Sequence, residues 1–145
     1  MDMTLTPIGV VKNSIKDLET EDWKKAVCEI IVNEDQKEAL SLIEEFSHVI
    51  VLYWMHKVSP SQRLVMRVHP RGRQDLPLVG VLASRSPARP NPIGVSTVTL
   101  LERRDNVLKV MGLDAADGTP VLDIKPYIPG YDSPAKAETP DWVTK

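Results

Sequence analysis

The sequence is short of cysteine, and that scarcity excludes two kinds of site. Its 145 residues include one cysteine, Cys28. One thiol cannot form an internal disulfide, and it cannot supply a zinc site built from several cysteines. We therefore expect a chain that binds no metal and works in the reducing cytoplasm. Cys28 is expected to be a small buried hydrophobe, with a reactive thiol as the alternative.

Long apolar runs are absent as well. No stretch approaches the roughly 20 apolar residues of a membrane-spanning helix. The start of the chain, MDMTLTPIG, lacks the basic and apolar regions of a signal peptide. We therefore expect no membrane partner. The apolar share of 42% is enough for a core, and we expect one domain at residues 1–132 with a loosely ordered tail at 133–145.

A large excess of one charge is also missing, because the formal net charge is only −2. The charges are nevertheless unevenly distributed. Residues 57–89 contain seven lysines and arginines and one acid, so this stretch carries +6 and the rest of the chain −8. The imbalance indicates a basic face on an acidic body, a surface suited to nucleic acid. The alternative is a solvated, arginine-rich loop.

Alternating and apolar runs predict strands more often than helices. The expected strands cover residues 7–13, 26–32, 48–56, 64–69, 78–83, 96–102, 107–113 and 120–124. One helix is expected at 33–45, with Asn33 as its cap. The run 49–55 predicts a strand buried on both faces, with Tyr53 and Trp54 as core mass. These patterns favour an all-β barrel of about seven strands with one short helix.

A proline-rich loop at residues 81–95 is the most unusual stretch. Its three prolines lie within residues 87–92, and each fixes its own backbone φ angle and holds the preceding residue extended. A loop stiffened in this way can hold Arg85 and Arg89 in fixed positions, which lowers the ordering cost of binding. Two alternatives stay open: a plain connection between strands, and a PxxP ligand for an SH3-like partner.

Three blocks of the sequence resemble the TsaA-like family. They are EFSHVIVLYWMHK at residues 45–57, SRSPARPNPIG at 84–94 and LDAADGTPVLDIKPYIP at 113–129, in the family's order. The resemblance implies a single-sheet β-barrel that forms a homodimer and acts as a tRNA N6-methyltransferase. It also implies S-adenosyl-L-methionine as the cofactor and threonylcarbamoyladenosine, in the tRNA anticodon loop, as the acceptor. No GxGxxG follows a strand, so a Rossmann-type methyltransferase is not expected.

The resemblance also assigns functional residues. The implied cofactor contacts are His56, Lys57, Arg85, Val95, Asp117, Gly118, Thr119 and Pro120. From the residues alone, His56 is more often a structural hydrogen-bonding group, and Asp117-Gly118 is first a turn signal. We expect this turn and the proline-rich loop to meet and form a socket for the cationic methyl donor. The expected tRNA contacts, through phosphates, are Arg63, Arg67, Arg71, Arg73, Arg89 and Asn91.

An acylated exocyclic nitrogen is a poor nucleophile, so a base should assist the transfer. The candidates are Asp114, Asp117, Asp123 and His56, of which Asp117 is favoured because its turn should leave the carboxylate accessible. Relatives carry PRQ after the first strand, whereas this chain has ETEDW at 19–23, and it stops before the C-terminal extension of longer members. The alternatives are a methyltransferase for a small molecule or protein, and a non-catalytic ligand- or RNA-binding module.

Overall fold

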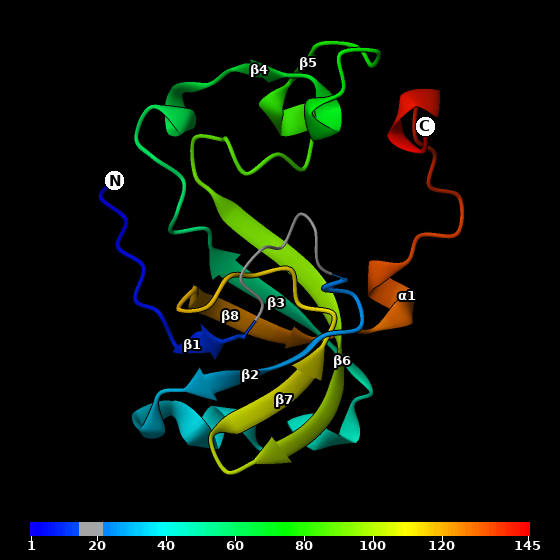
Figure 1. Ribbon diagram of the computed structural model, residues 1–145. Coiled ribbons are helices and arrows are strands. Elements are labelled where there is room, and N and C mark those ends of the chain that lie inside the picture. Colours follow the sequence, from blue (N-terminus) through cyan, green and yellow to red (C-terminus); the bar gives the residue numbers. More distant parts are fainter. Residues whose placement is uncertain (15–21) are drawn as a thin grey trace. The chain divides into compact units, whose positions relative to one another are not determined.

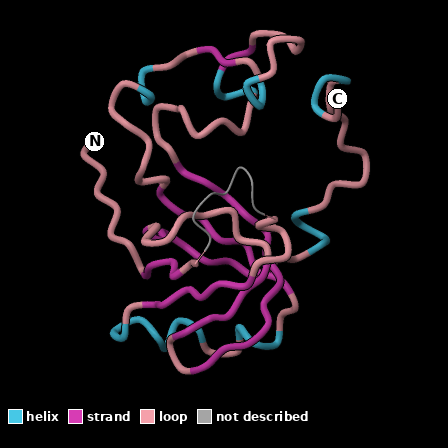
Figure 2. Tube along the Cα trace, in the orientation of Figure 1, coloured by secondary structure: helices cyan, strands magenta, loops and turns pink. Residues whose placement is uncertain are grey.

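The chain folds into two compact units. A computed structural model describes residues 1–14 and 22–145. The first unit comprises residues 1–56 and 93–127, and the second comprises 57–92 and 128–145. Most strands belong to the first unit, while the second consists mainly of loops and short helical turns (Figure 2). Among the described residues, no helix has the length and hydrophobicity that crossing a bilayer requires.

Six antiparallel strands of the first unit close into a barrel (Figure 1). Their order around the barrel is β1-β2-β7-β6-β3-β8. The strands are β1 Gly9–Lys12, β2 Val27–Val32, β3 His48–Trp54, β6 Ile93–Arg104, β7 Val107–Met111 and β8 Pro120–Pro126. The predicted all-β barrel is confirmed, with six strands in the barrel where about seven were expected.

Side chains that alternate between buried and exposed positions fill the barrel. In β2 and β7 every second residue is buried, and Ile30 and Leu108 have no exposed surface. In β3 the buried residues Val49, Val51 and Tyr53 alternate with half-buried ones. The prediction that the run 49–55 is buried on both faces is therefore wrong in part, because one face of the strand looks out of the barrel.

Cys28 faces the barrel core from β2. Burial, assisted by the charge of neighbouring Glu29, raises the pKa of its thiol to about 11. Very little thiolate is then present at neutral pH, and the thiolate is the reactive form. The prediction of a small buried hydrophobe is confirmed.

The predicted helix at 33–45 is wrong as an α-helix. The segment forms two 3-10 helices, Glu34–Leu40 and Ile43–Glu45, which are separated by Leu42 in the left-handed conformation with φ of 70°. The Asn33 side chain makes no helix cap and instead donates to Pro7 O at 3.1 Å. Leu40 and Ile43 pack against the barrel core from these short turns, so a continuous helix is not required.

The second unit contains a two-stranded sheet and several single helical turns. β4 Arg67–Val68 pairs antiparallel with β5 Val79–Gly80. The helical turns are Gln62–Leu64, Pro70–Gly72, Val81–Ala83, Asp141–Val143 and the short α-helix α1 Pro129–Asp132. The predicted strands at 64–69 and 78–83 are shorter than expected, because helical turns replace one end of each.

Candidate functional site

The segment between β7 and β8, residues 112–119, is held against β1 by main-chain hydrogen bonds. The N–H of Gly118 donates to Val11 O at 2.8 Å, and the N–H of Val11 donates to Thr119 O at 2.9 Å. These bonds continue the pairing of β1 with β8. The turn predicted at Asp117-Gly118 is therefore present, and it is fixed to the barrel wall.

Two residues from other strands fasten the same segment. Asn13, just after β1, donates its main-chain N–H to Asp117 Oδ1 at 2.8 Å and its Nδ2–H to Ala115 O at 2.7 Å. Tyr53 of β3 donates its hydroxyl to Asp114 O at 2.8 Å. These anchors are 61 to 104 positions away in sequence. The fold, and not the local sequence, therefore fixes the segment.

The Tyr53 side chain occupies space that a glycine leaves open. Its ring packs against Gly94 of β6 so closely that a Cβ there would overlap the ring. Its hydroxyl also shares a 3.1 Å hydrogen bond with Ser96 Oγ. Burial raises the pKa of the phenol, so the hydroxyl stays protonated at neutral pH. Tyr53 packs in the barrel core, as predicted, but the sequence did not indicate that its hydroxyl would also anchor segment 112–119.

Three of the residues assigned to the cofactor form the turn itself. Thr119 is buried, and both its hydroxyl and its N–H donate to Ala116 O. Gly118 has a φ of +81°, a conformation that favours glycine. Pro120 opens β8. Thr119 therefore shapes the turn, and the exposed atoms are those of Asp117 and Gly118.

The candidate bases differ in what their polar atoms contact. Asp117 Oδ1 accepts a main-chain N–H, as described above for the turn. Asp123 accepts the N–H of the next residue and forms an ion pair with Lys125 at 2.9 Å. His56 is exposed just beyond β3. The Asp114 carboxyl makes no hydrogen bond or ion pair with any described residue, and burial raises its pKa.

The remaining cofactor assignments are exposed residues. His56 and Val95 belong to the barrel unit, and Val95 lies in β6 with 44% of its surface accessible. Lys57 and Arg85 belong to the second unit. The predicted socket draws residues from both units, and it stays a prediction. Residues 19–21, where the sequence departs from the family's PRQ, lie outside the described ranges.

Arginines of the second unit mostly donate to oxygen atoms of that unit. Arg63 Nε donates to Pro90 O at 2.7 Å, and its Nη2 donates to Asn91 Oδ1 at 3.4 Å. Arg89 Nη1 donates to two carbonyls of its own loop, at 3.1 Å each. These bonds brace the proline-rich loop in addition to its prolines.

Two further arginines hold the C-terminal tail. Arg71 donates to Val143 O at 2.8 Å and to Lys145 O at 2.6 Å. Arg73 donates to Lys145 O at 2.6 Å and pairs with Asp75. Arg71 adopts a φ of 56°, an uncommon conformation for a residue with a side chain. The tail is thus attached to the arginine-rich loop within the second unit.

Arg67 and Arg85 are the exceptions in this unit. Both are exposed. Neither makes a hydrogen bond or ion pair with a residue in the described ranges 1–14 and 22–145. These two guanidinium groups are the ones that an external anion can meet without displacing an internal partner.

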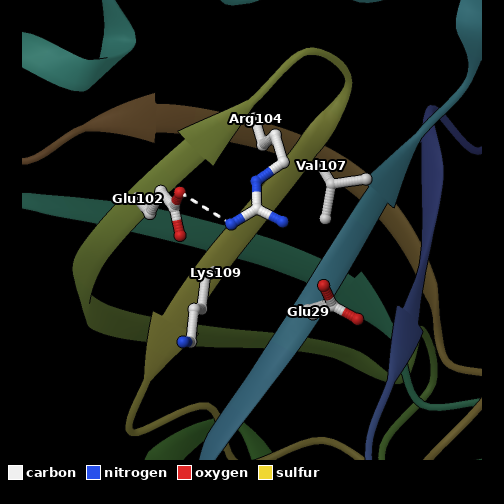
Figure 3. A pocket seen from close by; sticks show the side chains of 5 residues that line it. All are labelled: Glu29, Glu102, Arg104, Val107 and Lys109. Atoms are coloured by element: carbon white, nitrogen blue, oxygen red, sulfur yellow. Dashed lines mark hydrogen bonds and ion pairs between the residues drawn. The ribbon is translucent and has the colours of Figure 1, made fainter.

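Sequence reasoning missed a charged hollow on the outside of the barrel (Figure 3). It has a volume of about 260 Å³ and is lined by Glu29, Glu102, Arg104, Val107 and Lys109. Strand register places Lys109 of β7 between Glu29 of β2 and Glu102 of β6, and Arg104 pairs with Glu102 at 3.0 Å. Opposite charges on adjacent strands support sheet pairing, so we assign the hollow a structural role. In the described part of the chain, no cluster of three or more histidine, cysteine or acidic residues suits a metal ion.

Comparison with known proteins gives consistent matches. The family model described as the tRNA-methyltransferase O N-terminal domain matches residues 18–133. An S-adenosyl-L-methionine-binding protein of Archaeoglobus fulgidus is 45% identical over 134 residues, which cover 90% of this chain and 93% of that protein. A tRNA (adenine(37)-N6)-methyltransferase of Mus musculus is 43% identical over 98 residues, which cover 68% of this chain and 22% of the mouse protein.

Solved structures are similar as well. A crystal structure of TrmO has a TM-score of 0.78 and 34% identity, and the match covers 96% of this chain and 64% of that one. The TrmO structure from Pseudomonas aeruginosa has a TM-score of 0.76 and 33% identity, with coverages of 95% and 61%. This chain therefore spans less than two thirds of either solved chain. The resemblance seen in the three sequence blocks is confirmed, and the chain belongs to the tRNA-methyltransferase O N-terminal domain family.

Proposed function

We propose that this chain is an S-adenosyl-L-methionine-dependent tRNA methyltransferase acting on N6 of an adenosine. The observation that carries the proposal is the family match over residues 18–133. Relatives named for S-adenosyl-L-methionine binding and for tRNA (adenine(37)-N6) methylation support it. At a finer level, we propose threonylcarbamoyladenosine in the anticodon loop as the acceptor, because the three sequence blocks resemble enzymes of that specificity.

The barrel unit has side chains that fit a cationic methyl donor. S-adenosyl-L-methionine, when bound, supplies a methyl group on a positively charged sulfur. Asp117 Oδ2 has no partner among the described residues, so it can face a cation. A Cβ at Gly118 would have nothing within 4 Å, which leaves room beside the turn. The proposed cofactor contacts remain His56, Lys57, Arg85, Val95, Asp117, Gly118, Thr119 and Pro120.

The task of the protein in this reaction is alignment. A sulfonium is already a good leaving group, so the protein must chiefly line up the attacking nitrogen, the methyl carbon and the sulfur. Alignment of this kind can supply roughly 7–11 kcal/mol of the barrier reduction. The segment 112–119 suits this task because its main chain is bonded to β1, Asn13 and Tyr53. Groups on such a segment need little further ordering when a ligand binds.

The arginine-rich unit is the proposed tRNA contact. Arg67 can approach a phosphate without losing a partner among the described residues. A guanidinium has five N–H donors, so arginines that already bond to a carbonyl retain donors for a phosphate. The proposed contacts remain Arg63, Arg67, Arg71, Arg73, Arg89 and Asn91. A second copy of the chain is a further proposed partner.

Transfer of a labelled methyl group tests the proposal. The purified chain is incubated with S-adenosyl-L-methionine labelled in its methyl group and with tRNA from cells that lack this methylation. A parallel sample uses tRNA without the threonylcarbamoyl group. We expect label only in the first tRNA. No label in any tRNA would overturn the activity, whereas equal label in both tRNAs would overturn only the proposed acceptor.

Ligand binding without catalysis is a second candidate function. One observation favours it: the Archaeoglobus relative, whose length this chain nearly matches, is named for binding alone. Calorimetry distinguishes the two candidates. Affinity for S-adenosyl-L-methionine without transfer to any tRNA would support the binding role, and transfer would exclude it as the whole function.

A further inference from the structure

Asp114 lies between two buried anchors. Leu113 and Ala115 are buried in the barrel core, whereas Asp114 between them is exposed. Tyr53 holds Asp114 O at 2.8 Å, and Asn13 holds Ala115 O at 2.7 Å. The carboxyl is therefore presented from a main chain that is fixed on both sides.

The Asp114 carboxyl has no bonding partner in the described part of the chain. It makes no hydrogen bond or ion pair there, and burial raises its pKa although part of the side chain reaches solvent. The titratable groups beside it are Tyr53 of β3 and Asp117 of the same segment, and the charge of Asp114 raises the phenol pKa of Tyr53. Neutral Asn13 and Ser96 approach the segment from β1 and β6. A carboxylate in such surroundings is a stronger base than an ordinary one.

The other candidate acids are already used. Asp117 Oδ1 receives the Asn13 N–H and closes the turn. Asp123 accepts the N–H of Ile124 and pairs with Lys125. Both oxygens of Asp114, in contrast, lack a partner among residues 1–14 and 22–145.

We propose that Asp114 accepts the N6 proton of the acceptor nucleoside, and that Tyr53 and Asn13 position it. This inference rests on the proposed function. The N6–H bond breaks, and its proton goes to a carboxylate oxygen of Asp114. The electron pair left on N6 forms the bond to the methyl carbon, and the pair of the broken carbon–sulfur bond stays on sulfur as a neutral thioether. Asp114 then returns the proton to water, while Asp117, favoured earlier as the base, keeps its role toward the cofactor.

Three Asp→Asn variants test the assignment in single-turnover methyl transfer to tRNA. Asp114→Asn should lower the rate by about 10²–10⁴-fold, with unchanged cofactor affinity in calorimetry. Asp117→Asn should mainly weaken cofactor affinity. Asp105→Asn is the matched control, because Asp105 lies in the β6–β7 turn with φ of 56°, a conformation that asparagine also adopts. It should leave both quantities unchanged.

The pH dependence separates a proton acceptor from a structural residue. The wild-type rate of methyl transfer should fall at low pH as Asp114 becomes protonated. The pH–rate profile of Asp114→Asn should lack this acidic limb. Tyr53→Phe should lower the rate and shift the limb, with the fold and the cofactor affinity retained. Carbon-13 titration of the Asp114 carboxyl provides a readout without turnover, and we expect it above the ordinary aspartate range.

Each contrary outcome has a distinct meaning. A wild-type rate in Asp114→Asn, or an Asp114 carboxyl that titrates at or below the ordinary range, would overturn the assignment and leave the proposed function standing. An unchanged rate and acidic limb in Tyr53→Phe would overturn the positioning role. No transfer by the wild-type chain would overturn the proposed function itself.

Discussion

The barrel unit and the arginine-rich unit use their charged side chains differently. In the barrel segment 112–119 the main chain is bonded to its surroundings, and the Asp114 carboxyl is left without a partner among the described residues. In the second unit, four of the six arginines donate to oxygen atoms of that same unit. The barrel unit fixes its backbone and keeps a charged group available, whereas most arginines of the second unit hold its loops and the tail.

The difference shows that charge content and charge availability are separate properties. The seven basic residues between 57 and 89 mark a basic region, but most of its arginines already donate hydrogen bonds to internal carbonyls. The composition does not single out the acids near β8, yet the side chain of one of them, Asp114, has no bond to any described residue. Availability depends on partners that come from distant parts of the sequence.

Gly94→Ala should have the largest effect on the barrel unit, because it disturbs the packing of Tyr53. The added Cβ would overlap the Tyr53 ring. The ring cannot move away easily, because the Tyr53 hydroxyl is hydrogen-bonded to Ser96 and to Asp114 O. Forced overpacking of this kind costs about 1–3 kcal/mol in the free energy of unfolding, measurable by urea denaturation. Gly130→Ala is the control, because a Cβ there meets nothing within 4 Å. Equal losses in both variants would contradict the proposed packing.

Arg71→Ala should release the tail, whereas Arg67→Ala should not. Arg71 bonds to main-chain oxygens of residues 142–145, and Arg67 has no partner among the described residues. We expect faster protease cleavage and hydrogen exchange in the tail for Arg71→Ala only. Arg67→Ala should instead reduce the salt slope of tRNA binding by about 1. A tail that stays protected in Arg71→Ala would show that these hydrogen bonds do not hold it.

Asp114→Asn should remove a small pH-dependent component of stability. The folded state raises the pKa of this carboxyl, so between the ordinary and the raised value the folded chain binds more protons than the unfolded chain. Stability from this group is therefore greatest at low pH and falls as pH rises through that window. The wild type should lose stability relative to Asp114→Asn across the window, as measured by urea unfolding at stepwise pH. A constant difference between the two would contradict the raised pKa.

Lys125→Ala should have the smallest effect. Lys125 and Asp123 form an ion pair at 2.9 Å, with 61% and 48% of their side chains exposed. Exposed pairs contribute about 0.2–1 kcal/mol, and salt screens them further. Thermal unfolding at low and high salt measures the change. A larger loss that persists at high salt would show that Asp123 has a role beyond the surface pair.

Local patterns predicted much of the fold. Alternating residues in β2 and β7 and the run in β3 placed these strands, because each strand fills the barrel with every second side chain. The helix at 33–45 failed because left-handed Leu42 interrupts it and the barrel needs only a few apolar contacts there. The strands around β4 and β5 were overestimated, because the helical turn Gln62–Leu64 overlaps the start of the first predicted strand and the turn Val81–Ala83 replaces the end of the second.

Less of the candidate site was predictable. The Asp117-Gly118 turn follows from its residue types, since this pair is a strong turn signal. The anchoring by Asn13 and Tyr53 does not, because it depends on contacts across 61 to 104 positions. Thr119 could not be recognised as a buried turn residue, because the strand that pairs with it, through the N–H of Val11, lies far away in the sequence. Polar residues just outside a strand, such as Asn13, are the one signal that could have suggested an anchor.

Nucleoside mass analysis of bulk tRNA from cells with and without the gene tests the central claim most directly. The account predicts that N6-methylated threonylcarbamoyladenosine disappears on deletion while its unmethylated precursor accumulates. The wild-type gene should restore the methylated nucleoside, and an Asp114→Asn gene should not. An unchanged nucleoside profile after deletion would contradict the account.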